Sequence, residues 1–151
     1  MQPVDRQGGT SLCYVLASRP EAVRDTLTAA REDLVRLGPS CEALGLCELV
    51  LAEALNNIVE HAYEDRSDGE IRLCLSLDKG RLSAQIEDGG RTMPNGSLPN
   101  GKLGELDVPV QDLPEGGFGW FLIRSMTEDL RYRRKDGVNY LTFSMALGEG
   151  L

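Results

Sequence analysis

The chain has 151 residues, and its 16 Lys and Arg against 24 Asp and Glu give a formal net charge of -8 at pH 7. This length is enough to bury a core without disulfides or a structural metal, so we expect one domain over residues 1–151. The acidic balance disfavours nucleic acid and anionic membranes as partners, because both are bound through clustered Lys and Arg. No apolar run approaches the roughly 20 residues of a membrane-spanning helix, and the N-terminus lacks a signal pattern, so we expect a cytoplasmic protein.

The cysteine and histidine content disfavours a metal or redox centre. The four cysteines form no Cys-x-x-Cys pair, and the chain has a single histidine. Zinc sites usually combine closely spaced cysteine pairs with one or more histidines, and this chain lacks such pairs. We therefore expect four reduced, buried thiols at Cys13, Cys41, Cys47 and Cys74.

The first third of the chain predicts one strand and two helices. Residues 10–18 are short and partly β-branched or aromatic, which predicts a strand that stops at Pro20. Apolar residues then recur every three or four positions, which predicts a helix of about 18 residues with Ser18 available as its cap. A second helix is expected from Ser40 to Tyr63.

The remaining elements complete a two-layer fold. Apolar residues alternate with polar ones over residues 71–77 and 82–88, on either side of Lys79-Gly80, which predicts a β-hairpin. A segment rich in glycine and proline follows, and then a helix at 118–126 and strands near 128–134 and 138–147 are expected. We therefore predict an α/β (α+β) two-layer sandwich, in which helices cover one face of a mixed, mostly antiparallel sheet.

The second helix places a carboxylate and a carboxamide side by side. Glu53 and Asn57 are four residues apart, so they project from the same side of the helix. Such a pair could bind a hard cation through the amide oxygen while the carboxylate accepts a proton. An exposed polar helix face is the alternative interpretation.

Two glycine-rich segments suit a nucleotide. Asp88-Gly-Gly90 stands where the chain leaves the second hairpin strand, so the carboxylate could accept a hydrogen bond from an exocyclic amine. Gly116-Gly-Phe-Gly119 precedes a helix, whose first N–H groups would suit a phosphate. Taken singly, the first segment could be an ordinary turn and the second an ordinary glycine-rich helix entry.

Together and in this order, the three segments resemble the N-box, G1-box and G2-box of the GHKL ATPase superfamily. The chain is most similar to the bacterial anti-sigma-factor serine kinases of partner-switching systems, over roughly residues 10–147. The matching segments are Glu53-Ala-Leu-Asn-Asn57-Ile-Val-Glu-His61, Asp88-Gly-Gly90 and Gly116-Gly-Phe-Gly119-Trp-Phe-Leu-Ile.

The resemblance implies a Bergerat-type ATP-binding fold and a role for each matching residue. Glu53 would be the catalytic base, Asn57 the magnesium ligand and Asp88 the partner of the adenine amine. Residues 89–115 would form an ATP lid. The ATP-binding residues that the resemblance implies are Asn57, His61, Asp88, Gly90, Gly117, Phe118 and Gly119.

The chain also departs from the family pattern. Thr92 stands where the second glycine of the G1-box would fall, and Glu115 stands where many relatives carry a basic residue. Arg91 and Lys102 are the basic residues of the expected lid. The last strand has Asn139 where a threonine often orders water near adenine; Thr142 is a possible replacement.

The resemblance implies an enzyme that uses ATP and magnesium to phosphorylate a serine of a small antagonist protein. It further implies a homodimer that sequesters a sigma factor or similar regulator. One alternative is a nucleotide-binding module that sequesters its partner without kinase activity, which the acidic Glu115 favours slightly. A sensor histidine kinase ranks lower, since 151 residues leave no room for a sensor and phosphoacceptor helices.

Overall fold

The computed structural model describes residues 10–93 and 117–147. Its strands are β1 (Thr10–Ala17), β2 (Glu70–Asp78), β3 (Arg81–Asp88), β4 (Glu128–Lys135) and β5 (Val138–Ala146). Its helices are α1 (Pro20–Val35), α2 (Cys41–Asn57), the π-helical η1 (Ile58–Ala62) and α3 (Gly117–Met126). The elements expected from the sequence are therefore present, with shifts of a few residues at their ends.

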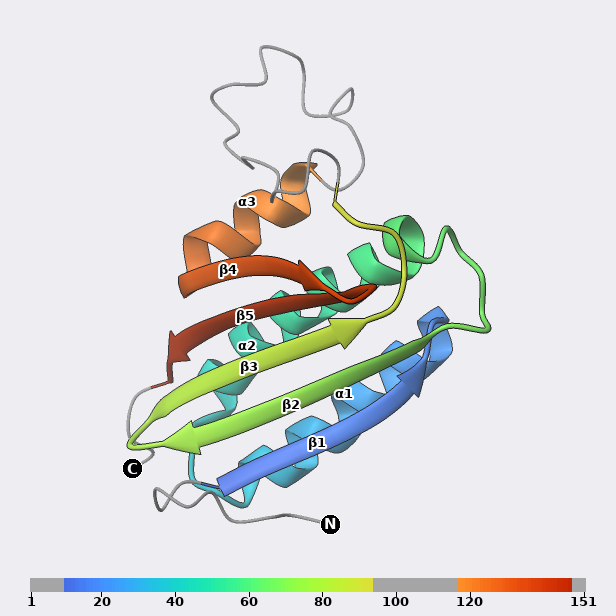
Figure 1. The fold of residues 1–151 in the computed structure, drawn as a ribbon. Coiled ribbons are helices and arrows are strands. Elements are labelled where there is room, and N and C mark those ends of the chain that lie inside the picture. Colours follow the sequence, from blue (N-terminus) through green and yellow to red (C-terminus); the bar gives the residue numbers. More distant parts are fainter. Residues whose placement is uncertain (1–9, 94–116, 148–151) are drawn as a thin grey trace.

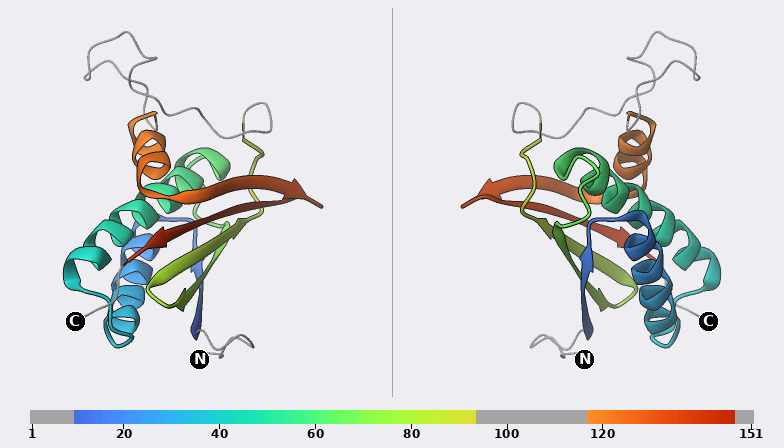
Figure 2. Two further views of the ribbon diagram at one scale, coloured as in Figure 1. Left: turned by 90° about the vertical axis from the view of Figure 1, so that its left-hand side faces the viewer. Right: turned by 90° about the vertical axis from the view of Figure 1, so that its right-hand side faces the viewer.

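The strands form one sheet in the order β1-β2-β3-β5-β4, and all four pairings are antiparallel. The helices lie against one face of this sheet and leave the other face open (Figures 1 and 2). This arrangement confirms the predicted two-layer sandwich. It also brings the end of β3 and the start of β5 side by side through the pair Asp88 and Asn139, which are 51 residues apart in the chain.

The alternating pattern of the strands supplies the core. Residues at every second position of β2 and β3 face the helices and are almost fully buried, among them Leu73, Leu75, Leu82 and Ile86. The helices contribute Val50, Leu51, Leu55 and Ile123 to the same cluster. Because this core extends to the end of β3, the side chains beyond it are held on a rigid support.

The caps of the two long helices differ. Ser40 caps α2 by accepting a hydrogen bond from the backbone N of Ala43 at 3.2 Å. The prediction that Ser18 caps α1 is wrong, since Arg19 occupies the N-cap position and no side chain caps this helix. Ser18 is buried and joins the loop before β2 instead, by donating to Arg66 O and accepting from Gly69 N.

The end of the second helix also differs from the prediction of one continuous helix to residue 63. After Asn57 the chain widens into η1, where Tyr63 N donates to Ile58 O, five residues earlier. A π-turn adds one residue to the helical turn, and such turns occur often at functional sites. Residues beyond Asn57 are therefore rotated away from the face that a regular helix would give them.

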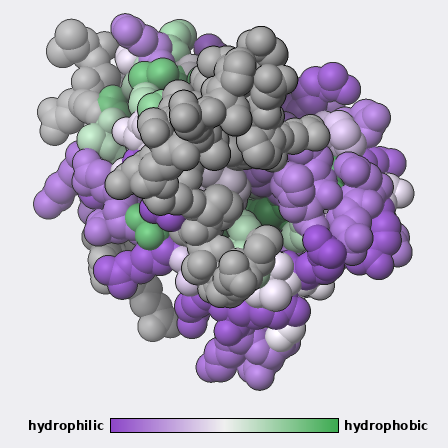
Figure 3. Space-filling view, turned by 90° about the horizontal axis from the view of Figure 1, so that it is seen from above, coloured by the Kyte–Doolittle hydropathy of each residue, from purple (hydrophilic) through white to green (hydrophobic). Residues whose placement is uncertain are grey.

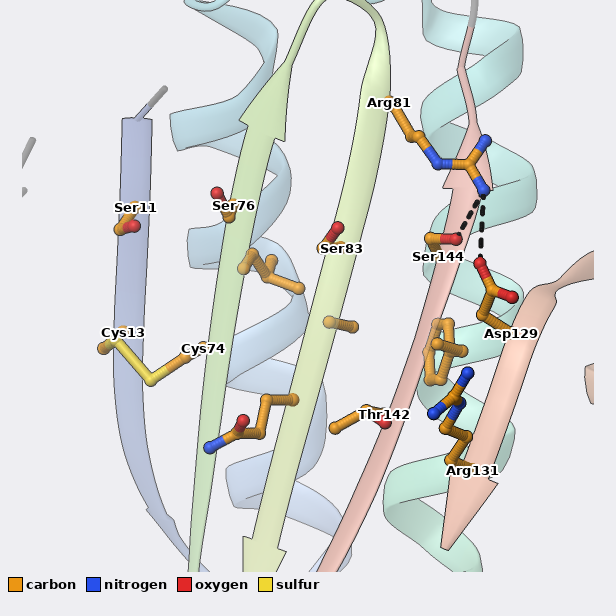
Figure 4. A pocket seen from close by; sticks show the side chains of 14 residues that line it. Ser11, Cys13, Cys74, Ser76, Arg81, Ser83, Asp129, Arg131, Thr142 and Ser144 are labelled. Atoms are coloured by element: carbon orange, nitrogen blue, oxygen red, sulfur yellow. Dashed lines mark hydrogen bonds and ion pairs between the residues drawn. A yellow bond between two sulfur atoms is a disulfide. The ribbon is translucent and has the colours of Figure 1, made fainter. Parts of the chain in front are cut away.

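The open face of the sheet holds a hollow of about 600 Å³, whose lining combines serine and threonine residues with charged and apolar ones (Figure 4). Cys13 and Cys74 face each other there, in register on β1 and β2, and form a disulfide. The prediction of four buried, reduced thiols is therefore wrong for this pair; for Cys41 it is right about the free thiol but wrong about burial, since Cys41 is exposed. It is right about burial for Cys47, where burial raises the pKa of the thiol to about 12.

β4 lies at one end of the sheet and carries most of its basic charge. Arg131, Arg133, Arg134 and Lys135 fall within the last five residues of this strand. Arg133 lies over the ring of Tyr140, 4.5 Å from its centre. The register between β4 and β5 shifts between Glu128 and Arg131, so the strand is irregular near its start.

Two further predictions concern membranes and the lid. Among the helices of the described residues, none has the length and hydropathy needed to span a membrane. Of the expected ATP lid, residues 89–93 are described, whereas residues 94–115, including Lys102 and Glu115, lie outside the described part of the chain.

Candidate active site

Three segments of the predicted site meet at one end of the molecule. The start of α3 lies at the top of Figure 1, the junction of α2 with η1 lies below it to the right, and β3 ends further down, where the chain that follows it lies against η1. Seen from above, the described surface there includes a small apolar patch bordered by strongly polar residues (Figure 3). The candidate residues carried by these three segments therefore lie at the same end of the sheet.

Glu53, Asn57 and Gly119 converge at this end. A Cβ atom added to Gly119 would lie 2.5 Å from Oε2 of Glu53 and 3.6 Å from Nδ2 of Asn57. The first turn of α3 therefore lies directly against the carboxylate of Glu53, and a side chain at position 119 would displace that carboxylate. The predicted adjacency of Glu53 and Asn57 holds, and the lack of a side chain at position 119 allows this close approach.

Asn57 is buried, so the alternative of an exposed polar helix face is wrong for this residue. Its side chain is 6% exposed, and its Nδ2 has no hydrogen-bond partner among the described residues. An unsatisfied buried polar group costs about 1 to 3 kcal/mol, which indicates that a ligand completes it. Because the two ends of a carboxamide have the same shape, a half-turn of the side chain would present an oxygen at this position instead.

The residues at this point fit a magnesium ion that is held mainly by a nucleotide. The described residues contain no cluster of three or more His, Cys, Asp or Glu that could hold a metal unaided. Magnesium in phosphate-transfer sites takes only one or two protein oxygens together with substrate phosphates. The carboxamide of Asn57 and the neighbouring carboxylate of Glu53 could supply these one or two protein oxygens.

The N-terminus of α3 adds a positive end to the site. The helix begins at Gly117, so its first N–H groups have no partner within the helix. These groups and the helix dipole favour an anion at this position. The predicted phosphate-binding residues Gly117, Phe118 and Gly119 therefore form the first turn of a helix that starts beside Glu53 and Asn57.

Asp88, at the end of β3, is 6% exposed. Its Oδ1 accepts two hydrogen bonds, from Asn139 Nδ2 at 2.8 Å and from Gly90 N at 2.9 Å. Burial raises the pKa of Asp88 above its ordinary value, while these two bonds and the charge of Arg134 hold the rise back. No described residue donates to Oδ2, so the described part of the chain leaves this oxygen without a hydrogen bond.

The backbone after Asp88 is fixed by several partners. Gly89 N donates to the Tyr63 hydroxyl at 2.7 Å, and Arg91 N donates to Ala62 O at 2.8 Å. A Cβ atom on Gly90 would lie 2.5 Å from Ala62 O, so only glycine allows the chain to pass this close to η1. Thr92 turns its hydroxyl to that of Tyr132, 3.0 Å away. The first residues of the expected lid are thus part of the rigid site.

From the sequence, Asn139 stood out only as a departure from the family pattern, and nothing indicated that Tyr132 and Arg134 support Asp88 with it. Asn139 is 3% exposed and bonds directly to Asp88, whereas Tyr132 and Arg134 bond to Asn139. The prediction that Thr142 replaces the family threonine is wrong, because Thr142 lies on the opposite face of β5 and lines the hollow of the open face (Figure 4). The alternation of β5, which places residues 139 and 142 on opposite faces, could have indicated this.

His61 is much more exposed than Asn57. Its side chain is 52% exposed, and its Nε2 is 3.9 Å from Oε2 of Glu60. The π-turn of η1 accounts for this position, since it rotates residue 61 away from the face that carries Glu53 and Asn57. A role for His61 at the phosphates stays a prediction.

Comparison with known proteins identifies the domain. Residues 16–145 match the family described as histidine kinase-like ATPase domain. The chain is 32% identical over 108 residues to the serine-protein kinase RsbW of Bacillus mycoides, and equally to those of Bacillus thuringiensis and Bacillus anthracis. Each match covers 70% of this chain and 66% of the relative. With its antiparallel sheet, its helices on one face and its three converging segments, the chain belongs to the histidine kinase-like ATPase domain family.

Proposed function

We propose that this chain is an ATP-dependent protein serine kinase and anti-sigma factor. It would phosphorylate a small antagonist protein and sequester a sigma factor or similar regulator. The observation that carries the proposal is the convergence of Glu53, Asn57 and Gly119 at the start of α3, in a chain of an ATPase-domain family. The curated relatives, which are named serine-protein kinases, support a serine of a protein as the acceptor.

ATP would bind with its base at β3 and its phosphates at α3. The free Oδ2 of Asp88 would accept a hydrogen bond from the adenine amine, and the first turn of α3 would receive the phosphates. Asn57 would hold magnesium through its carboxamide oxygen. The bound ion would neutralise charge on the phosphate oxygens.

Glu53 would act on the acceptor. Its carboxylate takes the proton of the serine hydroxyl while that oxygen forms a bond to the γ-phosphorus. The bond from the γ-phosphorus to its bridging oxygen breaks, and ADP leaves. Because Glu53 lies against Gly119, the base and the phosphate-binding turn share one fixed geometry.

The partners and the setting follow from the resemblance rather than from a described surface. We expect a homodimer in the cytoplasm, with the antagonist and the sigma factor as alternative protein partners. Size exclusion with light scattering would test the dimer.

The test of the proposal separates binding from transfer. Glu53→Gln keeps the shape of the side chain and should leave ATP binding nearly intact, while it slows phosphate transfer to the cognate antagonist by about 100-fold or more. Asn57→Ala should weaken both magnesium-dependent ATP binding and transfer. Binding is measured by calorimetry, and transfer by labelled ATP.

Glu48→Gln is the matched control, since Glu48 lies on the same helix but bonds to Arg31 of α1 at 2.8 Å, away from the site. It should leave both readouts unchanged. Full transfer by Glu53→Gln would remove Glu53 from the role of base. ATP binding without transfer to a verified antagonist would favour the sequestration module without kinase activity.

A further inference from the structure

The outer face of α2 carries two exposed leucines. Leu46 is 44% exposed and Leu49 is 46% exposed, whereas the neighbouring Val50 is fully buried in the core. The side of α2 toward α1 is covered, since Glu48 bonds there to Arg31. Single exposed apolar residues need no explanation, but apolar side chains that gather on one face often mark a contact with another protein.

The two leucines lie in line with the proposed catalytic base. Leu49 is four residues before Glu53 and Leu46 is seven before it, and these spacings place all three on one side of the helix. With a rise of 1.5 Å per residue, the leucines lie roughly 6 and 10 Å from Glu53 along the helix axis. We call Leu46, Leu49 and Glu53 the α2 stripe.

Gly45 leaves the helix backbone bare beside the α2 stripe. It lies inside α2, where glycine is less favourable than alanine. A Cβ atom at this position would meet no atom within 4 Å, so no neighbour within the fold requires glycine here. Gly45 is four residues before Leu49, so the bare backbone adjoins that leucine. The missing side chain would let a partner approach the helix closely.

The charges at the ends of the α2 stripe have one sign. Glu42 is exposed and lies one helical turn before Leu46, and Glu53 lies one turn after Leu49. The two leucines thus stand between two carboxylates. The surface that complements them is apolar in the middle and basic at the end that meets Glu42.

We propose that the α2 stripe is the docking surface for the acceptor protein, which packs apolar side chains on Leu46 and Leu49 while its serine reaches Glu53. The inference rests on the proposed function, because it takes Glu53 as the base. An acceptor that touches Glu53 also covers the surface around it, and a typical protein contact covers about 800 Å² of each partner. The matching segment of the acceptor carries apolar residues roughly 6 to 10 Å from its serine, with a Lys or Arg beyond them.

The experiment separates docking from chemistry. The probe is an acceptor protein to which the wild type transfers phosphate, together with a form of it in which alanine replaces the serine, which docks without reacting. Leu49→Gln should raise the KM for the acceptor and the Kd of the alanine form by about 10-fold, because the apolar contact is lost. Its kcat and its Kd for ADP should not change. Glu53→Gln should do the opposite, lowering kcat and keeping KM.

Two further variants test the rest of the surface. Leu46→Gln should act on KM in the same way as Leu49→Gln. Gly45→Ala should raise the melting temperature, because alanine favours a helix, and yet weaken docking of the alanine form by about 5-fold or more through the added methyl group. Higher stability together with weaker docking does not arise from damage to the fold.

Leu37→Gln is the matched control, because Leu37 is also an exposed leucine but lies in the turn after α1, outside the α2 stripe. It should keep the wild-type KM. An unchanged KM in both Leu46→Gln and Leu49→Gln would overturn the inference. If these variants changed only the oligomeric state in size exclusion, the stripe would be a contact between copies and the inference would also fall. A wild type that binds ADP but transfers phosphate to no acceptor would overturn the proposed kinase function itself.

Discussion

Gly119 lies so close to Glu53 that the Cβ atom it lacks would be 2.5 Å from Oε2 of that carboxylate. The two residues belong to different helices, so this contact sets how α3 meets α2. The carboxylate is the far end of a side chain and can move aside. A larger residue at position 119 would therefore change the position of the proposed base rather than the fold.

We predict that Gly119→Ala separates stability from activity. Alanine favours a helix over glycine by about 1 kcal/mol, so the melting temperature should not fall. Phosphate transfer to the antagonist should drop by about 10-fold or more, because the displaced carboxylate no longer lines up with the acceptor hydroxyl. Calorimetry of unfolding and a transfer assay provide the two readouts. Wild-type transfer in this variant would show that the close contact has no catalytic role.

Asp88→Asn should weaken adenine recognition but keep the structure of the apoprotein. The amide oxygen can still accept the bonds that Asn139 and Gly90 donate to Oδ1. At the other position an NH₂ group would face the adenine amine, and losing that charge-assisted bond should cost about 1.5 to 3 kcal/mol, or roughly 10- to 150-fold in affinity. Equal ADP affinity in variant and wild type would contradict the assignment of Asp88.

The pH dependence of nucleotide binding should reflect the raised pKa of Asp88. Burial favours the protonated form, so the carboxylate accepts a proton at a higher pH than the ordinary value of 3.8. A protonated Asp88 is a poor acceptor, and ADP affinity should therefore fall as pH drops through this raised pKa. Asp88→Asn should lack that transition. The measurement is calorimetry of ADP binding across the acidic range.

The same shift has a consequence for the free protein. A raised pKa means that the folded state holds the Asp88 proton more tightly than the unfolded state, so the stability from this group is present at low pH and is lost as pH rises through the folded pKa. At neutral pH, Asp88→Asn should thus leave the apoprotein at least as stable as the wild type. A marked loss of stability in urea denaturation at pH 7 would contradict this.

Reduction of the Cys13–Cys74 disulfide should lower the stability of the fold. The bond joins residues separated by 61 positions, and closing a loop of this length is worth about 4 kcal/mol in the chain-entropy description. The midpoint of urea denaturation should therefore fall when a dithiol reductant is added. Cys13→Ser should show the lower midpoint with and without reductant, and Cys41→Ser, which removes an exposed thiol, should behave like the wild type. A midpoint that does not respond to reductant would count against the disulfide.

The helices and strands could be predicted from local sequence, because the spacing of apolar residues differs between a helix and a strand. The alternation of residues 71–77 is enough to identify β2, and a spacing of four is enough to place Glu53 beside Asn57 on α2. The family resemblance added Asp88 and Gly119, whose local sequence is ambiguous. All of these signals lie within one element or one motif.

The features that could not be predicted depend on pairing between distant segments. Asn139 reaches Asp88 only because β5 pairs with β3 in one register, and Cys13 meets Cys74 only because β1 pairs with β2. A slip of one residue would have turned either side chain to the other face. The π-turn after Asn57 was missed for a different reason, since it depends on packing that no local pattern reveals.

The basic end of β4 has a consequence for how copies of this protein meet. A strand at the end of a sheet has unpaired backbone groups that can add a strand from another molecule, which is a common route to aggregation. Here the last five residues of β4 include Arg131, Arg133, Arg134 and Lys135, and the register shift near Glu128 makes the strand irregular. Two such edges would repel each other. A strand whose Arg134 supports the proposed adenine site thus also disfavours growth of the sheet from one molecule into the next.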